Sequence, residues 1–224
     1  MSMLTNLDLI CRVPLFAMLT PAQAGLLSKA VTKRRFKRGQ LIVAQGEKSN
    51  ALFIILAGRA RVLMTDKKLR QVILATLHPG AYIGEMSLID DEPHSASVET
   101  EIQTDVLVLG RAEFTQCLAE NLSMAYPLMH GLVQRLRKAD EQIGSLALMG
   151  VYDRVAKVLL DGAPADDEGL RVIRQKVSRQ DVAKMVGASR EMVSRVMRDF
   201  EEQGFIQTRD DGALVVNERR AVPR

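Results

Sequence analysis

The residue types with the most specific chemistry stand close together near the C-terminal end of the chain. On a helix that turns about 100° per residue, Arg190, Glu191, Ser194, Arg195 and Arg198 share one face, and apolar side chains occupy the opposite face. An arginine fork matches guanine O6 and N7, and a carboxylate accepts a hydrogen bond from cytosine N4. The pattern therefore predicts a helix that reads base edges in the DNA major groove.

The elements that would position this face are also indicated by the sequence. Ser178 is a typical N-cap for a preceding helix, Gly187 is a typical residue at its end, and Ser189 is a typical N-cap for the reading helix. Ser178 and Arg179 would then meet backbone phosphates. The following segment, FIQTRDDGALVV, reads as two strands around an Asp-Gly turn, so we expect a winged helix-turn-helix.

The alternative is that the same charges belong to a solvent-exposed helix stabilised by ion pairs, such as Glu191 with Arg195 and Arg195 with Asp199. The lone glutamate favours sequence reading, because on a phosphate-binding face it would repel the DNA backbone. Lys and Arg outnumber Asp and Glu by 17 to 14 in residues 1–150 and by 14 to 13 in residues 151–224. Neither half is basic overall, so DNA binding depends on which face carries the arginines.

One long helix is predicted from about residue 123 to residue 148. Its apolar residues recur in alternating steps of four and three, the spacing of a coiled-coil seam, and Pro127 falls at about the first turn, where a missing N–H does little harm. The helix could pack on its own domain, but the length and narrowness of the seam favour a homodimer. The proposed interface residues are Met129, Leu132, Leu136, Ala139, Ile143 and Leu146.

The first half of the chain is rich in short strands. A helix is expected over residues 19–30, with Thr20 as N-cap, and residues 36–109 alternate β-branched and apolar runs with glycine turns. This predicts an antiparallel jelly roll. The expected fold class is α+β, with a β-roll domain over residues 1–122, a dimerisation helix over 123–149 and a winged helix-turn-helix over 150–224, joined by a hinge at Gly150.

Composition excludes several classes of protein. With 224 residues, 47% of them hydrophobic and 26% charged, the chain can bury a core, and no apolar run approaches the roughly 20 residues that cross a bilayer. The N-terminal residues lack the pattern of a signal peptide, so we expect a cytoplasmic protein without a membrane partner. The two cysteines and three histidines have no metal-ligand spacing, so we expect no metal.

The segment SRQDVAKMVGASREMVSRVMRDFEEQGFI resembles the CRP/FNR family of bacterial transcription regulators. The resemblance covers nearly the whole chain, including GEMSLIDDEPHSASV in the β-rich half, the long helix and the winged helix. It implies that Arg190, Glu191 and Arg195 read a TGTGA-type half-site, that two such sites form an inverted repeat, and that RNA polymerase is a partner. It also makes the first domain a sensor of a small nucleotide effector.

The family's nucleotide cassette is only partly present. Its Gly-Glu pair corresponds to Gly84 and Glu85, but its phosphate-binding Arg-Ser pair corresponds to His94 and Ser95, which Ala96 follows. An imidazole in place of a permanent bidentate cation weakens phosphate binding unless another base supplies the charge. The candidate bases are Arg59, Arg61, Arg70 and Arg111. The family's adenine-contacting Thr-Ser pair corresponds to Ala139 and Asp140.

Some members of the family with altered pockets respond to cyclic di-GMP, whose guanine N–H groups could donate to Asp140. The resemblance therefore places cyclic di-GMP slightly ahead of cAMP as the expected effector. The effector would bind beneath the β-roll and contact the long helix. It would thereby change how the helix pair and the hinge at Gly150 position the two recognition helices. In the first alternative, Glu85 and Ser95 only shape a loop and the regulator is effector-independent. The rival class is a nucleotide-handling enzyme with Glu85, His94 and Asp140 as acid-base groups, but the chain has no P-loop and no nucleophile elbow.

Overall fold

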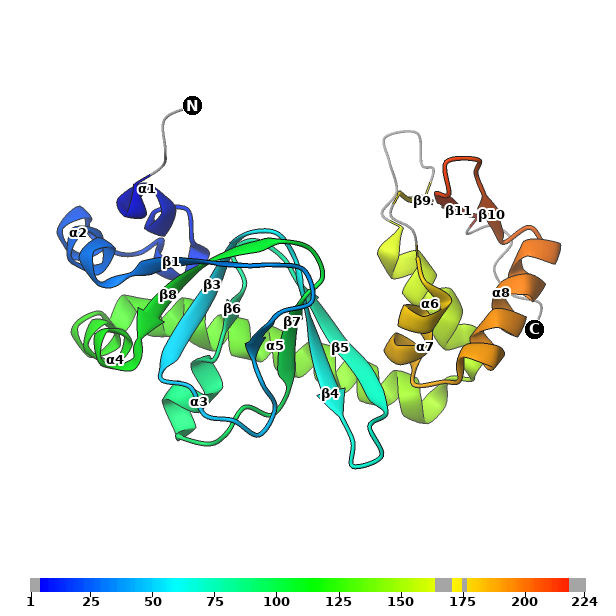
Figure 1. Ribbon diagram of the computed structural model, residues 1–224, viewed down its shortest axis with the longest axis horizontal. Helices are drawn as coiled ribbons and strands as arrows, with labels where there is room; N and C mark the ends of the chain where they lie inside the picture. The colour runs from blue at the N-terminus through cyan, green and yellow to red at the C-terminus, as the bar shows by residue number, and fades with distance from the viewer. Residues whose placement is uncertain (1–4, 164–170, 175–176, 218–224) are drawn as a thin grey trace. The chain divides into compact units, whose positions relative to one another are not determined.

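The computed structural model describes residues 5–163, 171–174 and 177–217, and at positions 122 and 123 the backbone alone. The chain forms two compact units, Met1–Leu136 and Arg137–Arg224 (Figure 1). Of the helices within the described residues, none is both long enough and apolar enough to span a membrane.

The first unit begins with the short helices α1 (Asn6–Ile10), η1 (Pro14–Phe16) and α2 (Pro21–Ala30). The expected N-cap of α2 is confirmed. The Thr20 hydroxyl accepts a hydrogen bond from the Gln23 backbone N–H, and Gln23 Oε1 accepts one from the Thr20 backbone N–H. Such a capping box satisfies two donors that the first helical turn would leave unpaired.

Eight strands follow and pair antiparallel in two four-stranded sheets, as the alternating apolar pattern predicts. The first sheet has the order β1 (Thr32–Phe36), β8 (Thr104–Gly110), β3 (Ala51–Ala57) and β6 (Tyr82–Ile83). The second has the order β2 (Leu41–Val43), β7 (Ser97–Thr100), β4 (Ala60–Thr65) and β5 (Gln71–Leu77). The short helix α3 (Glu85–Asp90) follows β6, and α4 (Arg111–Glu120) follows β8.

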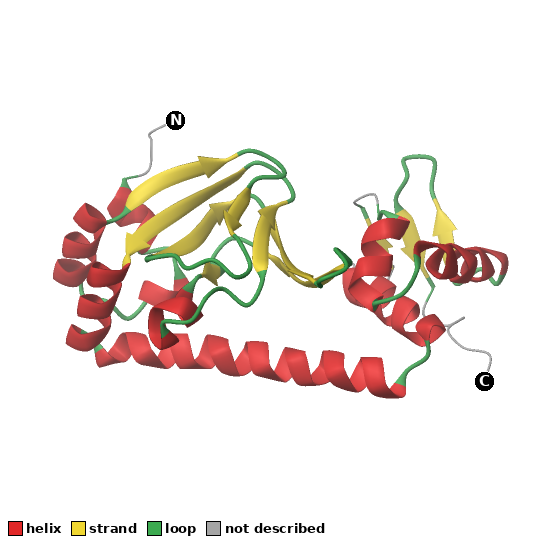
Figure 2. Cartoon of the chain, turned by 60° about the horizontal axis from the view of Figure 1, so that its bottom comes forward, coloured by secondary structure: helices red, strands yellow, loops and turns green. Residues whose placement is uncertain are grey.

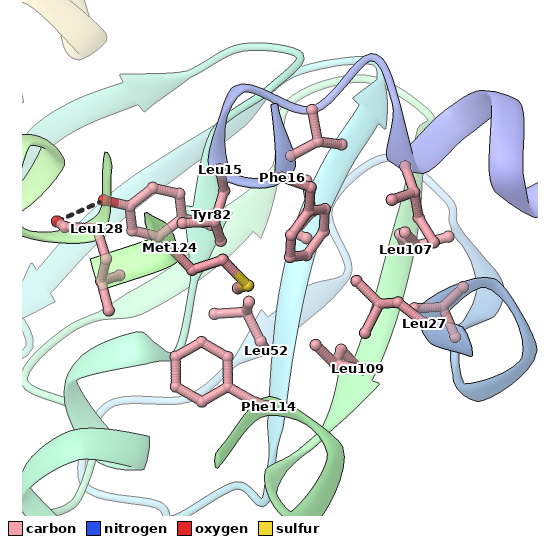
Figure 3. Packing of buried hydrophobic residues seen from close by; sticks show 14 of the residues in the cluster. Leu15, Phe16, Leu27, Leu52, Tyr82, Leu107, Leu109, Phe114, Met124 and Leu128 are labelled. Atoms are coloured by element: carbon pink, nitrogen blue, oxygen red, sulfur yellow. Dashed lines mark hydrogen bonds between the residues drawn. The ribbon is translucent and has the colours of Figure 1, made fainter. Parts of the chain in front are cut away.

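A single apolar cluster joins this β-roll to its surrounding helices (Figure 3). Leu52 and Leu109 come from the first sheet, Phe114 from α4, and Met124 and Leu128 from the long helix α5 (Leu122–Leu148). Each large buried side chain contributes about 1.5–3 kcal/mol of transfer free energy. The packing therefore fixes the first turns of α5 against the roll.

Helix α5 runs uninterrupted over 27 residues, within one residue of the predicted bounds (Figure 2). The prediction for Pro127 was wrong in one detail. The helix begins at Leu122, so Pro127 lies in its second turn and not its first. Because proline has no N–H, one helical hydrogen bond is lost there. Met124 and Leu128, which lie on either side of this position in the sequence, are packed in the core.

The second unit is a small helical domain with a three-stranded sheet (Figure 2). It contains α6 (Val151–Gly162), α7 (Arg179–Val186) and α8 (Arg190–Glu202). The antiparallel sheet has the order β10 (Ile206–Thr208), β11 (Leu214–Val216) and β9 (Arg171–Ile173). Gly212 has a positive φ of 82°, which the turn between β10 and β11 requires and which glycine adopts without strain. The predicted wing is confirmed.

Candidate functional sites

Helices α7 and α8 form the predicted helix-turn-helix with the predicted caps. The Ser178 hydroxyl accepts hydrogen bonds from the backbone N–H groups of Gln180 and Asp181, at 3.2 and 3.4 Å. Gly187 ends α7 with a positive φ of 63°, and the Ser189 hydroxyl accepts from the Met192 N–H at 3.1 Å. Local sequence therefore fixes where each helix begins and the turn between them.

The two faces of α8 separate as predicted. Four of its apolar side chains are buried in the core of the second unit, Val193, Val196, Met197 and Phe200, whereas Met192 is exposed. On the other face Arg190, Glu191, Arg195 and Arg198 are exposed, and Ser194 is half-buried. The hydrophobic contacts of one face thus hold the charged face toward solvent.

The four charged side chains on this exposed face of α8 are not used to hold the domain together. No hydrogen bond or ion pair joins the side chains of Arg190, Glu191, Arg195 or Arg198 to any residue that the structure describes. The ion-pair alternative, Glu191 with Arg195 and Arg195 with Asp199, is therefore absent from the described residues. Ser178 and Arg179 are also exposed, at the start of α7.

The β-roll holds a buried carboxylate at the start of α3. Gly84 has a positive φ of 93°, and a Cβ atom there would come within 2.8 Å of the Ala51 carbonyl oxygen. The next side chain, Glu85, is 1% exposed. One of its oxygens pairs with the Arg135 guanidinium, and the other, Oε2, has no hydrogen-bond partner. Burial raises the pKa of Glu85, and Arg135 opposes that rise.

His94 lies close to the same glycine, 8% exposed, with both ring nitrogens engaged. Nδ1 is hydrogen-bonded to the Ser87 hydroxyl at 3.1 Å and Nε2 to the Ser49 hydroxyl at 2.9 Å. Burial lowers the pKa of His94, which favours the neutral imidazole. The residue at this position is therefore not a permanent cation. Ser95 is exposed and Ala96 is buried.

The four candidate replacement arginines bind acidic side chains of their own. Arg59 and Arg61 share Glu101, and Arg70 pairs with Asp66. Arg111 pairs with Asp91 and donates to the Ser87 backbone carbonyl at 2.9 Å. Sequence reasoning missed the cation that does reach the site, Arg135. A buried glutamate requires a positive partner, which was the available signal, but nothing in the sequence says which arginine approaches it.

The remaining predicted residues lie along α5. Met129, Leu136, Ile143 and Leu146 each expose more than half of their surface, whereas Leu132 and Ala139 are half-buried. Ala139 and Asp140 belong to the second compact unit, and Asp140 is exposed. Among the described residues, no cluster of histidine, cysteine and carboxylate side chains could hold a metal ion.

Two family models match the chain. The model for the cyclic nucleotide-binding domain covers residues 33–121, and the model for the Crp-like helix-turn-helix domain covers residues 153–222. The chain is 31% identical over 196 residues to the cAMP-activated global transcriptional regulator Vfr of Pseudomonas aeruginosa, covering 84% of this chain and 90% of Vfr. It is 30% identical over 184 residues to the cAMP-activated global transcriptional regulator CRP of Salmonella typhimurium, covering 80% and 86%.

Among solved structures, the c-di-GMP responsive global regulator CLP of Xanthomonas campestris matches with a TM-score of 0.74. The match has 22% sequence identity and covers 88% of this chain and 98% of CLP, so it shows a common fold. The predicted fold class, a β-rich cyclic nucleotide-binding domain followed by a long helix and a winged helix-turn-helix, is confirmed.

Proposed function

Because the chain belongs to the CRP/FNR family of DNA-binding transcription regulators, we propose that it acts as a homodimer whose DNA reading responds to a nucleotide second messenger. The observation that carries the DNA-reading part is the exposed face of α8. Its four charged side chains have no partner among the described residues, while the opposite face is buried. A helix built in this way presents hydrogen-bonding groups to a groove at no cost in internal contacts.

On this proposal Arg190 and Arg195 donate to guanine, Glu191 accepts from cytosine, and Ser194 and Arg198 support them. Arg179 and Ser178 bind phosphates and fix the register. The preferred half-site resembles TGTGA. A two-fold dimer presents two recognition helices about one helical turn apart, so the operator is an inverted repeat.

The dimer interface follows from the seam of α5. A single chain exposes Met129, Leu136, Ile143 and Leu146 along one line of a helix. Apolar rows of this period are buried when a second helix packs against them. A second copy of the chain, with the same seam, is self-complementary to it. RNA polymerase is the further partner that a regulator of this family requires.

The nucleotide site centres on Glu85, whose unpartnered Oε2 can accept a hydrogen bond from a ligand hydroxyl. His94, Ser95 and Ala96 would face the phosphate, and Gly84 lets the backbone of this segment lie close to Ala51. The relatives named above support two effectors, since Vfr is cAMP-activated and CLP is c-di-GMP responsive. We favour cyclic di-GMP over cAMP, because a neutral His94 replaces the arginine with which the family's cassette binds the phosphate of cAMP.

An effector-independent regulator is the second candidate, and one observation favours it. His94 already has both nitrogens bonded to serines, and Glu85 is already paired with Arg135. Residues satisfied in this way can shape a loop with no ligand. An enzymatic role for Glu85, His94 and Asp140 has no such support, and the relatives are transcription regulators.

Fluorescence anisotropy tests the proposal. A labelled TGTGA inverted repeat and a scrambled duplex are titrated with the protein at one fixed salt concentration, without nucleotide and with cAMP, cGMP or cyclic di-GMP. If the protein prefers the repeat and one nucleotide changes that preference, the result supports both sequence-specific DNA reading and control by a nucleotide. Preference that no nucleotide alters supports the effector-independent candidate, and equal binding of both duplexes contradicts the assigned half-site.

A further inference from the structure

Tyr82, the first residue of β6, is packed directly against helix α5. Its side chain is buried in the core cluster, and its hydroxyl donates to the Leu128 carbonyl at 3.2 Å (Figure 3). Gly131, one turn further along α5, lies beneath that hydroxyl. A Cβ atom at Gly131 would stand 1.9 Å from the Tyr82 oxygen and 2.9 Å from its ring carbon Cζ. Glycine is therefore what allows the ring to lie on the helix.

Arg135 ties this contact to the buried carboxylate. Its guanidinium lies over the Tyr82 ring, 4.8 Å from the centroid, and Nη2 donates to the Tyr82 carbonyl at 2.6 Å. Nη1 pairs with Glu85. The backbone carbonyl and the ring of one tyrosine thus hold the arginine that balances Glu85. Glu85 and Tyr82 are three residues apart, so β6, α3 and α5 meet at this point.

We propose that Tyr82 and Gly131 form the joint that spreads an event at the Glu85–Arg135 pair along the long helix. The inference deepens the proposed function, because it rests on a nucleotide binding at Glu85. A ligand hydroxyl that bonds to Oε2 changes how Glu85 holds Arg135. Arg135 is itself a residue of α5, and its two contacts with Tyr82, together with the Tyr82 hydrogen bond to Leu128, join this stretch of the helix to β6. A change at Arg135 is therefore carried to Leu128 and Gly131 through Tyr82. Tyr82 is a positioning residue here and touches no ligand.

Two glycine substitutions on the same helix separate this role from a general effect on α5. Gly131→Ala forces the Tyr82 ring away and breaks its bond to Leu128. Gly144→Ala adds the same methyl group where nothing lies within 4 Å. Both exchanges raise helix propensity by a similar amount, so that effect cancels in the comparison. A second pair removes only a hydroxyl: Tyr82→Phe at the joint and Tyr126→Phe on the surface, where the side chain is 72% exposed.

The measurement has two readouts on the full-length protein. Calorimetry gives the dissociation constants of cAMP and cyclic di-GMP, and anisotropy gives operator affinity with and without each nucleotide. The coupling factor is the ratio of the two operator affinities, commonly about 5- to 150-fold in allosteric proteins. We expect Gly131→Ala to bind nucleotide within a few-fold of wild type but to lose most of its coupling factor. Tyr82→Phe loses part of it, and both controls keep it.

The outcomes distinguish this inference from the function on which it rests. A wild-type coupling factor preserved in Gly131→Ala and Tyr82→Phe overturns the joint and leaves nucleotide regulation standing. A wild-type protein that binds neither nucleotide contradicts both. Equal loss of coupling in Gly131→Ala and Gly144→Ala also overturns the joint, because it makes the effect one of the helix in general. Thermal unfolding of each variant confirms that the fold is retained.

Discussion

The proposed recognition helix and the proposed nucleotide site differ in how their charged side chains are bonded. On α8, Arg190, Arg195, Arg198 and Glu191 are exposed, and their side chains have no partner among the described residues. Around α3, Glu85 and His94 are buried and bonded to Arg135, Ser49 and Ser87. The first surface is ready for a ligand that brings its own hydrogen-bonding groups. The second has most of its polar atoms satisfied, so a ligand must exchange bonds that already exist.

The largest expected effect comes from the seam that brings two reading helices together. Leu136→Glu places a charge where the proposed interface buries an apolar side chain, which costs several kcal/mol at each of two symmetric positions. Sedimentation should show monomers at micromolar concentration, with operator affinity lost by at least about a hundredfold. The matched control is Gln134→Glu, which adds the same charge to an exposed position on the other side of α5. An intact Leu136→Glu dimer would refute the interface.

The next largest effect concerns the exposed charged face of α8. Arg190→Ala should cost about 1–3 kcal/mol on the operator and relax the preference for guanine at one position of each half-site. Arg179→Ala should weaken operator and random duplexes alike and lower the salt dependence by about one counterion. Competition anisotropy at several salt concentrations measures both. If the two variants lose affinity equally on every duplex, base reading does not belong to Arg190.

In the proposed nucleotide site, His94→Arg should strengthen binding of cAMP. It returns a permanent cation to the position where His94 is held neutral, and a hydrogen bond to a charged group is worth about 1.5–3 kcal/mol. The lower end of that free-energy range corresponds to a change of about tenfold, so calorimetry should show a dissociation constant for cAMP at least about tenfold lower than that of wild type. Lys48→Arg, on an exposed neighbouring loop, is the control. Unchanged or weaker cAMP binding would mean that the phosphate does not lie at residue 94.

The smallest effect is on stability against pH. Burial lowers the pKa of His94, so between that lowered pKa and the ordinary value near 6.5 the unfolded chain binds more protons than the folded one. His94 therefore contributes a loss of stability as the pH falls below about 6.5. Urea unfolding at pH 7.5 and 5.5 should show a smaller drop for His94→Gln than for wild type. His130→Gln, at an exposed position, should behave as wild type. An unchanged drop in His94→Gln would contradict the assignment.

The contrast also explains what could be predicted from the sequence. The recognition helix is local, since Ser178, Gly187 and Ser189 fix its limits within a few residues of the arginines. The proposed nucleotide site is assembled from segments far apart in the chain, such as Ser49, His94 and Arg135, and no periodicity brings these together. The same holds for Gly131, which reads in sequence as one glycine in a helix and owes its role to Tyr82, 49 positions earlier.

The central claim is that the proposed nucleotide site around Glu85 and His94 and the exposed face of α8 are thermodynamically linked. The most direct test is the dissociation constant of cyclic di-GMP, and of cAMP, measured by calorimetry with and without a saturating TGTGA inverted repeat. Linkage requires operator DNA to change nucleotide affinity by the same factor as the nucleotide changes operator affinity. We predict equal factors, different from one, for at least one of the two nucleotides. A nucleotide affinity that the operator leaves unchanged would contradict the account.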